Sequence, residues 1–118
     1  MHRVQVHERD GVTVVRGEGE LDAFAAPDLT SALAGIAPSG QAVVDLNAVS
    51  FLDSTALGAL VRGLRELAER GGSASVVLPR GTARRIFEIT ALDRALPVAA
   101  TVDAAVDELS QRADAGGC

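Results

Sequence analysis

The triplet Asp53-Ser54-Thr55 brings two hydroxyl groups and a carboxyl group to the predicted start of the most amphipathic helix in the chain. Aspartate, serine and threonine cap helix N-termini by accepting a hydrogen bond from a free backbone N–H. The same helix end attracts anions, because its free N–H groups and the helix macrodipole carry partial positive charge. The hydroxyl of Ser54 is therefore a candidate cap and also a candidate phosphate acceptor, and the two interpretations are compatible.

Lysine chemistry is absent from this sequence, and metal chemistry has little support in it. All 11 basic residues are arginine, which excludes a P-loop lysine, a Schiff-base lysine and a lysine beside a phospho-aspartate. His2 and His7 lie an odd number of residues apart on a predicted strand, so their side chains should point to opposite faces. With no cysteine nearby, we predict no zinc site and interpret both histidines as surface residues.

Three further arrangements of polar residues fit catalysis poorly. Ser54 lacks the glycine elbow of hydrolase nucleophiles, and its only candidate bases are the two histidines of the first strand. Asp45 and Asp53 are interpreted as a strand-end residue and a helix cap, not as the carboxylate pair of a glycosidase. The arginines within residues 80–85 are interpreted as a solvated helix face. We therefore predict no enzyme activity, no catalytic residue, no cofactor and no metal.

The charge balance favours a protein partner over a nucleic acid. The formal net charge is −5 and the isoelectric point is about 4.9, whereas nucleic-acid-binding domains usually carry a basic stripe. The chain has no apolar segment that would act as a signal peptide, and no apolar run approaches the roughly 20 residues of a membrane span. The single cysteine, Cys118, is the last residue and fits a reducing compartment. We expect a cytoplasmic protein without membrane insertion or direct nucleic-acid binding.

Turn residues and hydrophobic periodicity define the first elements. The alternation of valines on both sides of Asp10-Gly11 predicts a β-hairpin whose first strand lies at a sheet edge. A loop is predicted over residues 17–22. Pro27 suits the first turn of a helix, and apolar residues then recur at helical spacing as far as Ile36.

A short strand and a connection precede the amphipathic helix. Residues 42–46 form an almost continuous apolar run, which is typical of a buried strand. Residues 47–54 are predicted to form a connection in which Val49 and Phe51 point to the same side. This connection leads into the helix that begins at Ser54.

The second half of the chain continues the alternation of helices and strands. The amphipathic helix should end at Gly71-Gly72, and its predicted buried face consists of Leu57, Leu60, Val61, Leu64 and Ala68. A strand over residues 74–78 follows. A third helix is predicted from Thr82, with inward-facing Ile86, Phe87 and Ile89. Residues 97–100 are predicted as a last short strand, and Thr101 as the cap of a final helix.

The resulting order, β-β-α-β-α-β-α-β-α, predicts an α/β fold. Alternating strands and helices imply a central mixed β-sheet of about four to five strands, joined by right-handed crossovers and carrying about four α-helices. The N-terminal hairpin supplies the antiparallel edge of the sheet. Residues 1–112 should form a single domain and residues 113–118 a flexible C-terminal tail.

Several segments of the sequence resemble the STAS family (sulphate transporter and anti-sigma factor antagonist). The resemblance is carried mainly by the run Val43-Val44-Asp45-Leu46 and the run Val49-Ser50-Phe51-Leu52-Asp53-Ser54-Thr55-Ala56-Leu57-Gly58. The upstream segment Gly19-Glu20-Leu21-Asp22, the pair Gly71-Gly72 and residues 84–92 also fit. The similarity covers nearly the whole chain in order and with matching spacing.

The resemblance implies a STAS fold and a regulatory role. Stand-alone members of this size are mostly anti-sigma factor antagonists, which bind an anti-sigma factor and free the sigma factor, for instance in sporulation or stress responses. The anti-sigma factor is a serine kinase that binds ATP and phosphorylates the serine after the signature aspartate, which is Ser54 here. Phosphorylation ends the binding, and a serine phosphatase restores it. The implied partner-binding residues are Asp22, Asp53, Ser54, Thr55, Ala56 and Leu57.

Two other roles within the resemblance stay open, and one position departs from the family pattern. The chain could instead be a non-phosphorylated STAS accessory subunit of a lipid ABC transporter, although those relatives often have threonine where Ser54 stands. A scaffold in a stress-signalling assembly is the other alternative. Ala56 occupies the place where the family usually has glycine, and its methyl group is expected to affect how closely a partner approaches.

Overall fold

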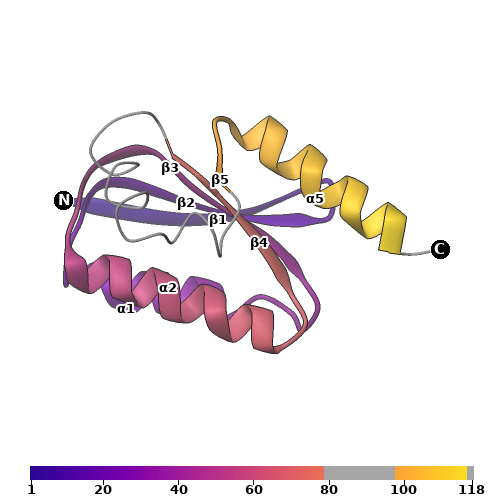
Figure 1. Ribbon diagram of the computed structural model, residues 1–118. Helices are drawn as coiled ribbons and strands as arrows, with labels where there is room; N and C mark the ends of the chain where they lie inside the picture. The colour runs from indigo at the N-terminus through magenta and orange to yellow at the C-terminus, as the bar shows by residue number, and fades with distance from the viewer. Residues whose placement is uncertain (79–97, 117–118) are drawn as a thin grey trace.

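The computed structural model describes residues 1–78 and 98–116 of the chain (Figure 1). Five strands form one sheet in the order β1-β2-β3-β4-β5, with bounds β1 His2–Arg9, β2 Val12–Leu21, β3 Gln41–Leu52, β4 Ser73–Val77 and β5 Val98–Ala99. The helices in the described part of the chain are α1 Ala26–Ala34, α2 Ser54–Glu69 and α5 Val102–Gly116. β1 pairs antiparallel with β2, and the other neighbouring strands pair in parallel. These features confirm the predicted mixed-sheet α/β fold.

Helices cover both faces of the sheet (Figure 1). α1 and α2 pack on one face, where their leucines share a core with Val15, Val44 and Val76 of the strands. α5 packs on the other face through Ala105, Val106 and Leu109, which contact a second apolar cluster of the sheet. Consecutive strand residues alternate between the two clusters, so both faces of the central strands are buried. The helix predicted from Thr82 and the arginines of residues 80–85 lie outside the described residues.

The N-terminal hairpin has the turn that its sequence predicts. Asp10 and Gly11 both have positive φ, at 53° and 80°. Two consecutive positive values define a type I′ turn, which matches the right-handed twist of the two strands. The strands stay in register from Arg9↔Val12 to His2↔Gly19. The hairpin prediction is confirmed, with β1 at the edge of the sheet.

β2 and β3 are both longer than predicted. β2 continues to Leu21, so the loop expected over residues 17–22 is mostly strand. β3 continues to Leu52, so the connection expected over residues 47–54 is also mostly strand. β3 contains irregularities of register, and its side-chain alternation changes at each of them. Polar residues therefore interrupt the apolar pattern of this strand, which made it look like a connection.

The first irregularity of β3 lies between Asp45 and Ala48. Over this stretch β3 has one more residue than the facing segment of β2. The carboxylate of Asp45 accepts a hydrogen bond of 3.0 Å from the backbone N–H of Asn47, a residue in the bulge. Asp45 is 5% exposed, so this hydrogen bond also gives a buried carboxylate a partner. Asp45 thus lies within β3 and not at its end, so its interpretation as a strand-end residue was wrong.

The second irregularity of β3 lies between Val49 and Phe51, where β3 again has one extra residue. The side-chain alternation reverses across a bulge. Val49 packs against the core beneath α1 and α2, whereas Phe51 is 55% exposed. The prediction that these two side chains point to the same side was wrong.

The buried face of α2 is rotated from the predicted one. Leu60 and Leu64 are buried as expected, but Ala68 is exposed and Leu67 takes its place in the core. The rotation brings small residues into the contact with α1, and the complete set of buried α2 residues is Ala56, Ala59, Leu60, Gly63, Leu64 and Leu67. Small residues allow the two helices to approach closely, which apolar periodicity alone does not reveal.

The C-terminal ends of α1 and α2 are joined by Arg70. Its guanidinium donates hydrogen bonds to the carbonyl groups of Leu33, Ala34 and Ile36 at 3.0 to 3.4 Å. These are carbonyls that a helix end leaves without an intrahelical partner. Gly71 follows with φ of 86°, and this left-handed residue ends α2 as the sequence predicted.

The last helix begins as predicted and continues further. Thr101 caps α5, because its hydroxyl oxygen accepts a hydrogen bond of 3.1 Å from the backbone N–H of Ala104. α5 extends to Gly116, so the helix includes the first four residues of the segment for which we expected a flexible tail. The assignment of residues 1–112 to a single domain stays a prediction.

Candidate functional site

The predicted site residues gather where β2 and β3 end. Leu21 and Leu52 are paired at the C-terminal ends of these parallel strands, so the segments that follow them leave the sheet side by side. The backbone N–H of Asp53 donates a hydrogen bond of 3.0 Å to the carbonyl of Leu21. This bond joins the segment containing Asp22 to the start of α2. Residues that are distant in sequence thus belong to one surface.

Asp53, not Ser54, caps α2. The Asp53 Oδ1 accepts a hydrogen bond of 2.8 Å from the backbone N–H of Ala56. Ser54 is the first residue of the helix, and both Ser54 and Thr55 are exposed. The interpretation of Ser54 as the cap was wrong, because the preceding carboxylate occupies that role. The serine hydroxyl has no hydrogen-bond partner within the described residues.

Ala56 and Leu57 differ in what they present to a partner. Ala56 is fully buried beneath the first turn of α2. Its methyl group therefore faces the core, and the expectation that it affects the approach of a partner was wrong. Leu57 is half-buried and packs partly on the core. Of the implied partner-binding residues on α2, Ser54, Thr55 and part of Leu57 are accessible.

Asp22 shapes the turn that leads from β2 into α1. Its Oδ1 accepts a hydrogen bond of 2.9 Å from the N–H of Phe24. Its carbonyl accepts hydrogen bonds from the N–H groups of Ala25 and Ala26, at 3.0 and 3.2 Å. An aspartate that binds the backbone two residues on forms an Asx-turn. Asp22 therefore holds this segment in a defined conformation, and it is half-buried beside the start of α2.

Two phenylalanines at this end of the sheet are missing from the predicted set. Phe24 is 83% exposed and Phe51 is 55% exposed. Phe24 lies in the turn organised by Asp22, and Phe51 is paired with Glu20 near the end of β3. Their sequence signal was the scarcity of aromatic residues, since the whole chain has three Phe and neither Trp nor Tyr.

The remaining polar candidates lie apart from this surface. His2 and His7 occupy opposite faces of β1, as predicted. His2 is half-buried and its Nε2 lies 2.9 Å from Asp28 Oδ2, so it is not a simple surface residue. Asp45 and Asp53 are eight residues apart, but two of these residues are extra residues of the bulges. The remaining six positions correspond to roughly 20 Å, which is too far for a glycosidase pair. Within residues 1–78 and 98–116, no cluster of side chains could hold a metal ion.

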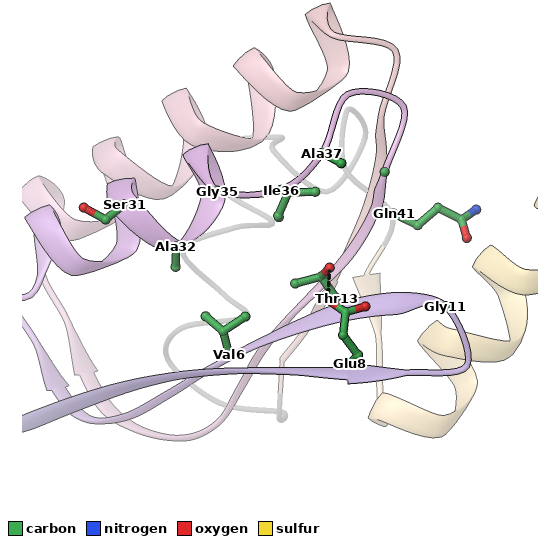
Figure 2. A pocket seen from close by; sticks show the side chains of 11 residues that line it. Val6, Glu8, Gly11, Thr13, Ser31, Ala32, Gly35, Ile36, Ala37 and Gln41 are labelled. Carbon is green, nitrogen blue, oxygen red and sulfur yellow. Dashed lines mark hydrogen bonds between the residues drawn. The ribbon is translucent and has the colours of Figure 1, made fainter.

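A groove of about 540 Å³ lies towards the opposite end of the sheet, between the hairpin and the end of α1 (Figure 2). Val6 and Ile36 line it, together with Glu8, whose carboxylate accepts a hydrogen bond of 2.7 Å from the Thr13 hydroxyl. None of the predicted site residues lines this groove. In addition, no helix in the described part of the chain is long and apolar enough to cross a membrane.

Removing the cap of α2 should have a measurable cost. We expect Asp53→Ala to lower the free energy of unfolding by about 1 kcal/mol, because the Ala56 N–H loses its acceptor. Urea denaturation monitored by circular dichroism measures the change. Asp53→Asn is the matched control, since an amide oxygen can still accept the hydrogen bond. An equal loss in both variants would show that the charge, and not the cap, stabilises the helix.

Comparison with known proteins assigns this chain to a family. The sequence model described as "STAS domain" matches residues 3–105. The anti-sigma-B factor antagonist of Bacillus subtilis is 30% identical over 104 residues, which span 87% of this chain and 95% of that protein. The crystal structure of an anti-sigma factor antagonist from Mycobacterium paratuberculosis has a TM-score of 0.81 and 35% identity, covering 92% of this chain and 93% of the other.

A more distant structure shares the fold. The Bacillus cell fate determinant SpoIIAA, solved in its phosphorylated form, has a TM-score of 0.71 and 24% identity, with 91% of this chain and 99% of the other covered. At this identity the likeness concerns the arrangement of the strands and helices alone. The fold, the match over residues 3–105 and the curated relatives together show that this chain belongs to the STAS domain family.

Proposed function

We propose that this protein is an anti-sigma factor antagonist, a non-enzymatic regulator that acts in the cytoplasm and is controlled by phosphorylation of Ser54. In its unphosphorylated form it binds an anti-sigma factor and thereby releases the sigma factor. The anti-sigma factor is a serine kinase that supplies the ATP site, and a serine phosphatase reverses the modification. The names of the relatives from Bacillus subtilis and Mycobacterium paratuberculosis support the class of function.

The exposure of Ser54 beside an independently capped helix is the observation that carries the proposal. A kinase must reach the hydroxyl, and Ser54 is exposed at the first position of α2. The helix does not need that hydroxyl, because Asp53 provides the cap. Phosphorylation can therefore change the surface without removing an interaction that holds the fold.

The charge of the phosphate accounts for the loss of binding. A phosphoserine adds about −1.5 to −2 charges at pH 7, next to the Asp53 carboxylate on a chain whose net charge is already −5. The helix N-terminus tolerates an anion, so α2 should remain folded. A partner surface that fits a neutral hydroxyl would instead meet added bulk, a desolvation cost and, where it is acidic, repulsion.

The direct test is incubation of the protein with its cognate anti-sigma kinase and ATP, followed by mass spectrometry. We expect one added phosphate, located on Ser54 and removed by the cognate serine phosphatase. Thr55→Ala should be modified normally and Ser54→Ala should not, which separates the two neighbouring hydroxyls. A phosphate found only on Thr55 would refute the site, and the absence of both binding and modification would refute the function.

A further inference from the structure

Phe24 and Phe51 expose large apolar side chains that a folded domain would ordinarily bury. They are 83% and 55% exposed, in a chain whose only aromatic residues are three phenylalanines. Aromatic side chains contribute strongly to core packing, and they are also enriched at the centres of protein interfaces. Two of the three phenylalanines are exposed, and the core of the described residues contains no aromatic side chain. This distribution points to a role for Phe24 and Phe51 at the surface.

The backbone holds both phenylalanines in defined positions. The N–H of Phe24 is bound by the Asp22 carboxylate in the turn before α1. Phe51 lies within β3, where its partner in the sheet is Glu20. The bulge after Val49 turns Phe51 away from the core and towards solvent. A backbone that is already ordered loses less conformational entropy on binding, so these segments suit a docking surface.

The segments that carry the two phenylalanines adjoin the proposed phosphorylation site. Phe51 precedes Ser54 by three residues, across the end of β3. Phe24 follows Leu21, whose carbonyl accepts the hydrogen bond from Asp53 at the start of α2. All of these residues belong to the same end of the sheet, at the carboxyl ends of β2 and β3.

The segments that contain the two phenylalanines are acidic. Residues 20–24 and 50–58 contain the three carboxylates Glu20, Asp22 and Asp53 and no basic residue. Apolar side chains in segments that carry one sign of charge are complemented by an apolar depression with a rim of the opposite charge. The expected partner surface is therefore hydrophobic at its centre and rich in arginine and lysine at its edge.

We infer that Phe24 and Phe51 are the apolar anchors with which this protein docks on its anti-sigma factor, entering a hydrophobic depression that has a basic rim. The inference rests on the proposed function and adds residues that carry the affinity. Anchors of this kind supply binding that does not depend on charge. The phosphate on Ser54 would then act at the same end of the sheet as the anchored contacts.

Binding of the purified cognate anti-sigma factor, measured by surface plasmon resonance, tests the anchors. We expect Phe24→Ala and Phe51→Ala each to weaken the complex by at least about 10-fold. Val6→Ala is the matched control, because Val6 is 52% exposed but lies on the edge strand β1 beside the groove. It should change affinity by less than 2-fold. Circular dichroism should show that all three variants remain folded.

The salt dependence tests the acidic segments. Glu20→Gln should slow association with the anti-sigma factor and reduce its sensitivity to salt, because one attractive charge is removed. If the wild type binds and both phenylalanine variants bind within 2-fold of it, the anchors are refuted while the proposed function stands. If the wild type itself does not bind an anti-sigma factor, the proposed function fails and the anchors fail with it.

Discussion

Replacing Ser54 by aspartate is expected to weaken binding of the anti-sigma factor by about 30-fold, and full phosphorylation by up to about 1000-fold. These factors correspond to roughly 2 to 4 kcal/mol of binding free energy. The aspartate adds one negative charge and the phosphate adds more, beside the Asp53 carboxylate that caps α2. The fold should be unchanged, because Ser54 is exposed and the cap is intact.

Ser39→Asp is the matched control for this charge substitution. Ser39 is exposed and has φ of 62°, a conformation that aspartate tolerates well. Its N–H binds the carbonyl of Arg70, at the far end of α2 from Ser54. The 16 residues of that helix separate the two sites by roughly 24 Å. Equal binding by Ser54→Asp and wild type in isothermal titration calorimetry would rule out a charge switch at this position.

The second large effect concerns the contact between α1 and α2. Gly63 of α2 is buried, and a Cβ atom added there would lie 2.5 Å from Cδ1 and 3.1 Å from Cβ of Leu33 in α1. Leu33 is itself fully buried and has little space to move. We expect Gly63→Leu to lower the free energy of unfolding by about 3 kcal/mol in urea denaturation, because the helices must separate.

A size exchange and a second glycine test the cause of that loss. Leu33→Ala in the Gly63→Leu background should recover part of the stability, although Leu33→Ala alone leaves a cavity and costs about 3 kcal/mol. Gly58→Leu is the control on the same helix, because the nearest atom to an added Cβ is the flexible end of Arg62 at 3.5 Å. It should be neutral or slightly stabilising. If Gly63→Leu and the wild type unfolded at the same urea concentration, the two helices would not meet at this residue.

The parts of the fold that depend on local chemistry could be predicted from the sequence. Asp10-Gly11 adopts the turn that these two residues favour, and Thr101 caps α5. The length of β3 could not be predicted in the same way. Its register shifts at two points, and a polar residue in a bulge, such as Asn47, has the same local appearance as a loop residue.

The site was predictable in its location but not in the roles of its side chains. The Asp53-Ser54-Thr55 triplet does begin α2, but all three residue types can cap a helix, and sequence cannot decide which one does. The burial of Ala56 and the exposure of Phe51 depend on how α2 and β3 are rotated about their axes. That rotation is set by tertiary contacts such as Gly63 against Leu33, which no local pattern contains.

The two bulges of β3 also mark where the length of this strand can change during evolution. Each extra residue reverses the alternation of faces, and two reversals restore it, so Leu46 and Leu52 both reach the core beneath α1 and α2. Loss of the extra residue of one bulge would remove one residue and one reversal together, so Leu52 would stay opposite Leu21 and in the core beneath α1 and α2. A homologue aligned with a single-residue gap at either bulge should therefore retain the position of α2 and, with it, the serine switch.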